Sequence, residues 1–142
     1  MRRSGSALER ACALIALAAA SATAASCDVL RGSCGDDLRD EEPAVYTAGS
    51  TVDGLYQSTS WDTAAMIDFP PGMGVRFVHG LGSVPVTWNA YIATARDGDG
   101  SEIVLATGEV ELTDIDAEAI TVRNGTCADL LLLVTAAAPE PP

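Results

Sequence analysis

The sequence predicts an all-β protein, a compact antiparallel β-sandwich of about eight short strands. The first observation is alternation: over residues 75–94, VRFVHGLGSVPVTWNAYIAT, the side chains alternate with a period of two on both sides of a glycine-marked turn. The second is that Gly, Pro and Asn-Gly pairs interrupt the chain at short intervals. The third is that no segment shows the spacing of an amphipathic helix.

Residues 75–94 are predicted to form a β-hairpin. In its first strand Val75, Phe77 and His79 share one face, and residues 80–83, Gly-Leu-Gly-Ser, form the turn. The second strand is expected to present one set of side chains to the core and the other to solvent. The inward set is Val86, Trp88, Ala90 and Ile92, and the outward set is Thr87, Asn89, Tyr91 and Ala93.

Residues 1–26 have the layout of a secretory signal peptide. Arginines precede an apolar run at residues 11–20 that is too short to span a bilayer, and small residues follow it. Residues 22–24, Ala-Thr-Ala, fit an ordinary signal peptidase site, whereas residues 24–27, Ala-Ala-Ser-Cys, resemble a bacterial lipobox. We favour the lipobox with Cys27 as the lipidated residue. The protein is then exported to the periplasm or cell envelope, with Cys27 as its only membrane anchor.

The cysteine count supports lipidation. Cys12 lies in the predicted signal peptide, which leaves Cys27, Cys34 and Cys127 in the exported chain. An odd number leaves one thiol without a partner. Lipidation of Cys27 removes that difficulty, and Cys34 and Cys127 are then expected to form a disulfide; the alternative is that Cys27 is itself a disulfide partner. The spacing contains neither a CxxC pair nor a Cys/His set, so no zinc site is expected.

Domain boundaries follow from composition. Residues 27–43 are predicted to be an acidic flexible tether, because GDDLRDEE at 35–42 is rich in charge and turn residues. The β-sandwich domain is predicted over residues 44–136, and residues 137–142 are predicted to be a disordered tail. Besides the hairpin, strands are expected at residues 45–47, 50–56, 65–69, 102–106, 109–112, 119–123 and 130–134.

The last three predicted strands carry the clearest patterns. In residues 109–112, Val110 and Leu112 are expected to face inward, and in residues 119–123 the inward pair is Ile120 and Val122. The dipeptide Asn124-Gly125 predicts a two-residue type I′ turn. Residues 130–134, LLLLV, form a continuous apolar run, which is typical of a central strand covered on both faces.

Charge and composition exclude several functions. The chain has 20 acidic residues against 8 basic ones, all arginine, and a net charge of -12. Such a surface repels nucleic acid and anionic lipid headgroups, so neither is an expected partner. One histidine, no lysine and no G-x-S-x-G motif remove the commonest catalytic and metal-binding arrangements. We therefore predict no enzyme, no catalytic residue, no metal and no cofactor; a small hydrolase with paired carboxylates is the least favoured alternative.

Two aromatic residues are the candidate binding residues. Trp61 stands in a polar segment, S-T-S-W-D-T, where an exposed indole could stack on a sugar or peptide, and Tyr56 is near it in the sequence. Trp88 is expected in the core by alternation, and His79 is expected to hydrogen-bond the adjacent turn. Residues 97–102, DGDGSE, resemble the start of a calcium loop but lack the required Gly and Glu positions, so a polar turn is favoured.

Several motifs resemble those of known small β-sandwich domains. The segment HGLGSVP at residues 79–85, followed by an alternating strand, is similar to a hairpin of phage-tail-associated proteins and H-type-lectin-like modules. With FPPG at 69–72 and VRNGTCADLLLLV at 122–134, the chain also resembles small exported β-sandwich proteins, lipoproteins among them, of GC-rich Gram-negative bacteria. The resemblance implies the fold and transfers no sugar-contact residue. We expect a module that binds a carbohydrate or protein partner at the cell envelope, or alternatively a structural or assembly subunit.

Overall fold

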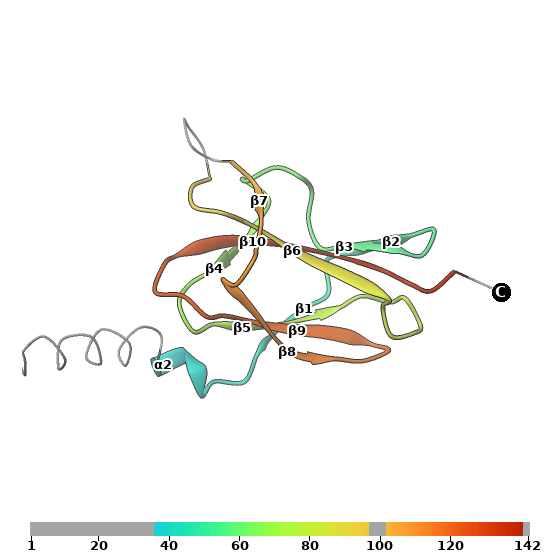
Figure 1. The fold of residues 1–142 in the computed structure, drawn as a ribbon, viewed down its shortest axis with the longest axis horizontal. Helices are drawn as coiled ribbons and strands as arrows, with labels where there is room; N and C mark the ends of the chain where they lie inside the picture. The colour runs from blue at the N-terminus through green and yellow to red at the C-terminus, as the bar shows by residue number, and fades with distance from the viewer. Residues whose placement is uncertain (1–35, 97–101, 141–142) are drawn as a thin grey trace, which may run out of the picture. The chain divides into compact units, whose positions relative to one another are not determined.

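A computed structural model describes residues 36–96 and 102–140, and these residues form ten strands and one short helix. The strands build two sheets that lie one above the other (Figure 1), so the predicted all-β sandwich is confirmed, with ten strands instead of about eight. In chain order the elements are α2 (Asp36–Arg39), β1 (Ala44–Tyr46), β2 (Ser50–Val52), β3 (Leu55–Gln57), β4 (Ile67–Phe69), β5 (Gly74–Val78), β6 (Thr87–Ala93), β7 (Val104–Leu105), β8 (Val110–Ile115), β9 (Ala119–Asn124) and β10 (Leu130–Ala137).

The two sheets differ in their strand order. The four-stranded sheet has the order β1-β5-β9-β8, and the six-stranded sheet has the order β2-β3-β10-β6-β7, with β4 pairing with another part of β10. All described pairs are antiparallel except β1 and β5, which run parallel. The described sandwich is therefore antiparallel as predicted, except at the edge strand β1.

The core lies between the sheets where the alternating patterns place it. Phe77, Ile120 and Val122 of the four-stranded sheet are 0% exposed, and Leu132 and Val134 of β10 meet them from the other layer. The outward side chains of the first part of β10 are covered as well, because Leu131 and Leu133 pack with Met66 and Ala93 in a second cluster. β10 is thus the central strand covered on both faces that the LLLLV run predicted.

The predicted hairpin at residues 75–94 is wrong. Both strands exist, but β5 pairs with β1 and β9 in one sheet, while β6 pairs with β10 and β7 in the other. Residues 79–86 therefore cross between the layers, which lie roughly 10 Å apart. Gly80 and Gly82 have φ values of 63° and 74°, so the glycines do form the expected turn, but that turn leads to a different sheet.

The predicted type I′ turn at Asn124-Gly125 is wrong for the same reason. β9 lies in the four-stranded sheet and β10 in the six-stranded one, and neither Asn124 nor Gly125 has a positive φ. Asn124 is instead fully buried: its Nδ2 donates to the carbonyls of Phe69 and Ala128, and its Oδ1 accepts from Thr126. Its amide stabilises the crossover between the sheets.

Three side chains that were predicted to face inward are less buried than expected. Val86 is 61% exposed, because it lies beyond the end of the core, and Leu112 is 42% exposed next to a register shift in β8. Trp88 does face inward with Ala90 and Ile92, but it is only half-buried at the border of the core cluster. The inward prediction for Trp88 is therefore confirmed, and its full burial is not.

Both ends of the described domain are hydrogen-bonded to the sandwich. Arg123 donates to the carbonyl oxygen of Leu38, which links α2, part of the predicted tether, to β9. At the other end β10 continues to Ala137, and the N–H of Ala138 donates to the carbonyl of Gly54. The predicted signal peptide, Cys27, Cys34 and the turn at residues 97–101 lie outside the described residues.

Candidate binding site

The outer face of the six-stranded sheet carries a row of uncharged polar side chains across four strands. Asn89 of β6 pairs with Thr135 of β10, Thr135 pairs with Gln57 of β3, and Gln57 pairs with Ser50 of β2. Because residues paired across a sheet point to the same side, these four side chains lie side by side. We call them the polar row.

A second row lies next to it, two residues away on each strand. Thr87 pairs with Ala137, Ala137 with Leu55, and Leu55 with Val52, and we call this set the apolar row. Val52 and Leu55 are 65% and 62% exposed. The two rows line a shallow groove of about 470 Å³, which Asp53 also lines.

An aromatic pair flanks the polar row on its other side. Tyr91 lies two residues after Asn89 on β6 and therefore on the same outer face. The indole of Trp61 meets the Tyr91 ring edge to face, with ring centroids 4.6 Å apart and planes inclined by 71°. Trp61 is 52% exposed, as the polar loop around it predicted, so one surface of the indole is open to solvent.

Three of the four polar-row side chains have no hydrogen-bond partner in the part of the chain that the structure describes: Ser50, Asn89 and Thr135. Gln57 is the exception, because its Nε2 donates to the carbonyl of Thr59 at the start of the Trp61 loop. Amide and hydroxyl groups both donate and accept hydrogen bonds. The polar row is therefore free to bond an external molecule through either type of group.

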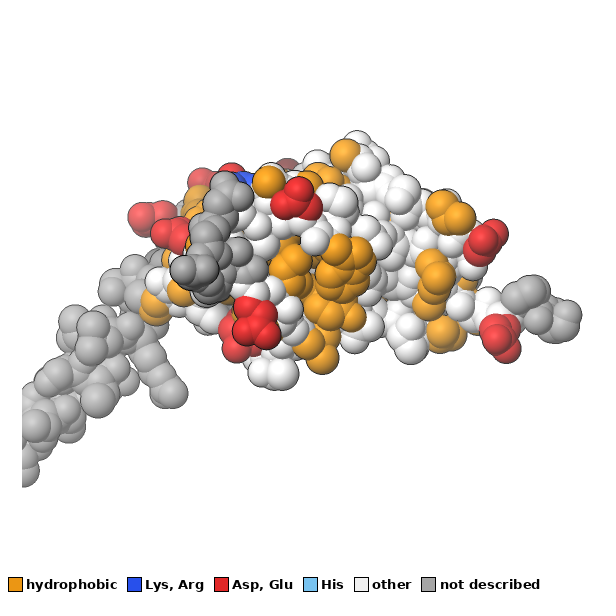
Figure 2. All heavy atoms as spheres, turned by 90° about the horizontal axis from the view of Figure 1, so that it is seen from above, with side chains coloured by type: hydrophobic (Ala, Val, Ile, Leu, Met, Phe, Trp, Pro, Cys, Tyr) orange, Lys and Arg blue, Asp and Glu red, His pale blue; other side chains and the backbone are white. Residues whose placement is uncertain are grey.

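Figure 2 looks onto this side of the sandwich. Hydrophobic side chains gather in the middle of the face and again toward the C-terminal end, with a band of uncharged surface between them. Acidic side chains lie beside the central hydrophobic group and toward both ends of the face, and no Lys or Arg shows in the band. Among the described residues that line the groove, Asp53 is the only one with a charged side chain. The face suits an uncharged polar ligand.

Tyr56, the other candidate binding residue, points to the opposite side of β3. Its ring is 2% exposed and meets the ring of His79 at a centroid distance of 6.2 Å. Its hydroxyl lies against Gly49 and has no hydrogen-bond partner among the described residues. Burial, and then the neighbouring Tyr46, raise the pKa of the Tyr56 hydroxyl well above 10.0. Tyr56 reaches the groove floor from below and presents no ring to solvent.

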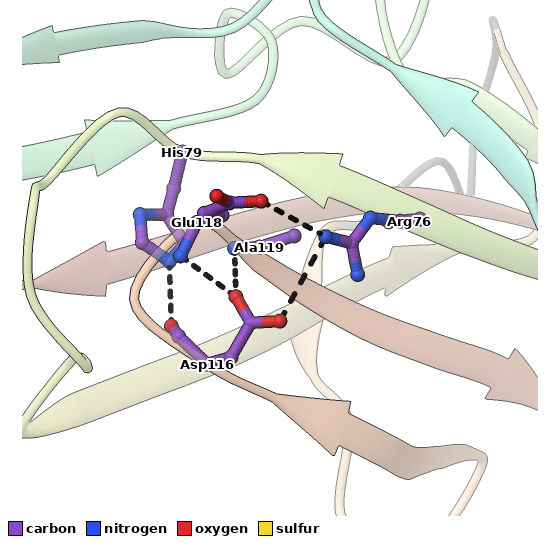
Figure 3. Close-up of polar contacts among 5 residues, drawn as sticks. All are labelled: Arg76, His79, Asp116, Glu118 and Ala119. Carbon is purple, nitrogen blue, oxygen red and sulfur yellow. Dashed lines mark hydrogen bonds and ion pairs between the residues drawn. The ribbon is translucent and has the colours of Figure 1, made fainter.

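His79 is at the centre of a second polar cluster, which lies next to Tyr56 and Thr51 (Figure 3). It is 1% exposed, its Nδ1 accepts from the N–H of Leu81 at 3.1 Å, and its Nε2 donates to the carbonyl of Asp116 at 3.2 Å. Its backbone carbonyl accepts from the Thr51 hydroxyl, and its N–H donates to Glu118. The predicted turn-bonding role of His79 is confirmed.

The carboxylate of Asp116 in the same cluster is held by the backbone. The N–H groups of Glu118 and Ala119 donate to its Oδ1 at 2.7 and 2.8 Å, and these bonds lower the pKa of Asp116 below its ordinary value. Arg76 stands 3.7 Å from Asp116 and from Glu118, as Figure 3 shows. The dashed lines in Figure 3 join each of the five residues to another within the cluster, which indicates a structural role.

Of the three predicted cysteine sites, only Cys127 lies among the described residues. Cys127 lies exposed in the crossover between β9 and β10. Cys27 and Cys34 lie outside the described residues, so the lipidation and the disulfide stay predictions. Within residues 36–96 and 102–140 no group of three or more His, Cys, Asp and Glu side chains could hold a metal ion. In the same residues no helix is long and apolar enough to cross a membrane.

Comparisons with known proteins add no relative. No family model, no curated protein and no solved structure matches this chain. The resemblance to lectin-like and tail-associated modules therefore stays a prediction.

Sequence reasoning found Trp61 but missed its neighbours. Tyr91 and Asn89 were predicted only as outward residues of a strand, and Ser50, Gln57 and Thr135 were not considered. The available signal was that each short strand places a small uncharged polar residue on its outward side. Which of these residues fall into one row depends on the pairing register, and no single strand contains that information.

Proposed function

We propose that this protein is a non-catalytic β-sandwich module of the cell envelope that binds a carbohydrate on the outer face of its six-stranded sheet. The observation that carries the proposal is the aromatic pair of Trp61 and Tyr91 directly beside the polar row. A sugar ring has one face of C–H groups that packs on an indole and a rim of hydroxyls that needs uncharged hydrogen-bond partners. Ligand sites generally combine apolar or aromatic surface with a few such polar groups.

The charge of the protein fits the same ligand. With a net charge of -12 and no lysine, the chain is unsuited to phosphate-rich or strongly anionic partners. The predicted export signal and Cys27 anchor would place the sheet face outside the cytoplasm, where envelope glycans are present. Export and anchoring are part of the proposal.

The test is retention of the full chain on immobilised neutral polysaccharides, with Trp61→Ala as the diagnostic variant. Loss of the exposed indole should weaken binding at least about tenfold, the factor that corresponds to about 1.4 kcal/mol. Val45→Ala is the control, because Val45 is also exposed, at 65%, but lies in the four-stranded sheet. Retention that is unchanged in Trp61→Ala, or equally reduced in Val45→Ala, would reject the proposed site.

A structural or assembly subunit is the second candidate. The observation that favours it is the cluster of exposed apolar side chains at one end of the sandwich, where Val52, Leu55 and Val86 are each more than 60% exposed. Contiguous exposed apolar surface often marks a contact between proteins. Sedimentation of the full chain and of Leu55→Asp separates the two candidates: an oligomer that the substitution dissociates supports assembly, and a monomer at all concentrations counts against it.

A further inference from the structure

The groove extends the candidate site well beyond the aromatic pair. Neighbouring strands in a sheet lie about 4.8 Å apart, so the polar row from Asn89 on β6 to Ser50 on β2 spans about 14 Å. That length exceeds a single sugar ring. Four hydrogen-bonding side chains repeat along it at an interval comparable with one sugar unit in an extended chain.

We propose that the polar row is an extended subsite for an uncharged oligosaccharide, which lies across the strands from the Trp61–Tyr91 pair toward β2. This inference rests on the proposed carbohydrate-binding function and assigns the length, direction and charge of the ligand. One sugar ring packs at the aromatic pair. The units that follow bond Asn89, Thr135, Gln57 and Ser50 in that order.

The free hydrogen-bonding groups of the polar row indicate which side of the groove the ligand hydroxyls face. Asn89, Thr135 and Ser50 keep their donors and acceptors uncommitted among the described residues, so a bound hydroxyl displaces no internal bond. The apolar row on the far side presents Leu55 and Val52 to the C–H edges of the same units. The ligand therefore meets hydrogen-bonding groups on one side of the groove and apolar groups on the other.

The charge around the groove determines the ligand class. No Lys or Arg lines the described groove, and Asp53 is its one acidic lining residue. A uronate or sulfated glycan would bring its anions to a site without a counter-charge, where desolvation costs free energy that no partner returns. An uncharged glycan meets no such penalty.

The experiment measures affinity as a function of ligand length. The full chain is titrated with mono- to hexasaccharides of glucose, N-acetylglucosamine, mannose, galactose and xylose, with oligogalacturonates as the anionic series. At least one neutral series should bind, with affinity that rises about tenfold or more from the monosaccharide to the tetrasaccharide and is constant beyond it. The anionic series should bind more weakly at every length.

Two substitutions locate the ligand along the row. Asn89→Ala should reduce affinity about threefold to tenfold from the disaccharide onward, while Ser50→Ala should do so only for the longest ligands, since one hydrogen bond is lost in each case. Trp61→Ala should weaken all lengths, the monosaccharide included. Thr47→Ala, an exposed hydroxyl residue that follows β1, is the control and should change nothing.

The outcomes separate this inference from the proposed function. Two outcomes would overturn the extended subsite but not the carbohydrate-binding function. The first is an affinity that does not depend on ligand length. The second is an affinity that is unchanged in both Asn89→Ala and Ser50→Ala while Trp61→Ala still loses binding. Tighter binding of oligogalacturonate would overturn the uncharged class. Binding of no glycan, or competition only by an extended polyglycine peptide, would overturn both proposals.

Discussion

The polar groups around His79 and those of the polar row lie in the same sandwich but differ in where their hydrogen bonds go. Both ring nitrogens of His79 and the carboxylate of Asp116 are bonded to nearby backbone groups, and the histidine is 1% exposed. Asn89, Ser50 and Thr135 have no such partner in the described chain. A polar group whose bonds are all internal contributes to folding, and one whose bonds are open is available to a ligand.

The comparison predicts that substitutions in the two regions separate stability from binding. His79→Leu removes both ring hydrogen bonds and leaves the N–H of Leu81 and the carbonyl of Asp116 unpaired. We expect the free energy of unfolding to fall by about 2–3 kcal/mol, because unsatisfied buried polar groups cost about 1–3 kcal/mol each. Urea denaturation monitored by far-UV circular dichroism measures the change.

The matched variant for this prediction is Asn89→Ala in the polar row. It removes a comparable polar side chain that is exposed and unbonded, so its free energy of unfolding should stay within about 0.5 kcal/mol of the wild type. Equal destabilisation by both substitutions would show that the two regions do not differ as described, and that the polar row is part of the fold's stability.

Residue patterns predicted the strands better than they predicted their connections. The alternation in β6 and β9 located the core side chains Ala90, Ile92, Ile120 and Val122, because a strand's two faces are a local property. The glycine turn after His79 and the Asn124-Gly125 pair each predicted a hairpin, yet both segments lead from one sheet to the other. A turn motif predicts only that the chain reverses direction. Which sheet the next strand joins depends on long-range packing.

The hairpin of β2 and β3 was not predicted, because residues 50–56 were expected to be strand with Gly54 as a break. Asp53 and Gly54 connect β2 and β3 with φ values of 51° and 75°, the two positive φ angles of a type I′ turn. The Asp-Gly pair was a sufficient local signal for this turn. The candidate site was harder to predict, because Ser50 and Thr135 are far apart in sequence and meet only through the registers of β2, β3 and β10.

Two tyrosines that pack in the core, Tyr56 buried and Tyr46 partly buried, test the same distinction. The hydroxyl of Tyr46 donates to the carbonyl of Ser58 at 3.0 Å, whereas the hydroxyl of Tyr56 has no partner among the described residues. Tyr46→Phe should therefore destabilise the fold by about 1 kcal/mol. Tyr56→Phe should be neutral or stabilise by up to about 1 kcal/mol, because it removes an unsatisfied hydroxyl and keeps the ring.

Thermal and urea unfolding of the two variants side by side give the comparison. Tyr56→Leu is the additional control, since it removes the ring as well and should destabilise clearly through lost core packing. A loss of stability in Tyr56→Phe that equals the loss in Tyr46→Phe would contradict the assignment of Tyr56 as the unbonded member of the pair.

The smallest expected effect is a pH dependence from Asp116 in the His79 cluster. The N–H groups of Glu118 and Ala119 hold the pKa of Asp116 below its ordinary value of 3.8. A carboxylate whose pKa is depressed in the folded state stabilises the fold at pH values above 3.8, and that stabilisation is lost as the pH falls through the folded-state pKa.

Asp116→Asn keeps an acceptor oxygen for both N–H groups but has no charge to lose. In urea titrations from about pH 7 to pH 2.5, the wild type should therefore be the more stable protein at neutral pH, and its advantage should shrink below pH 3.8. A constant difference across that range would mean that the backbone bonds stabilise the carboxyl group equally in both protonation states, and the description of the cluster as a charge-stabilising structural site would be wrong.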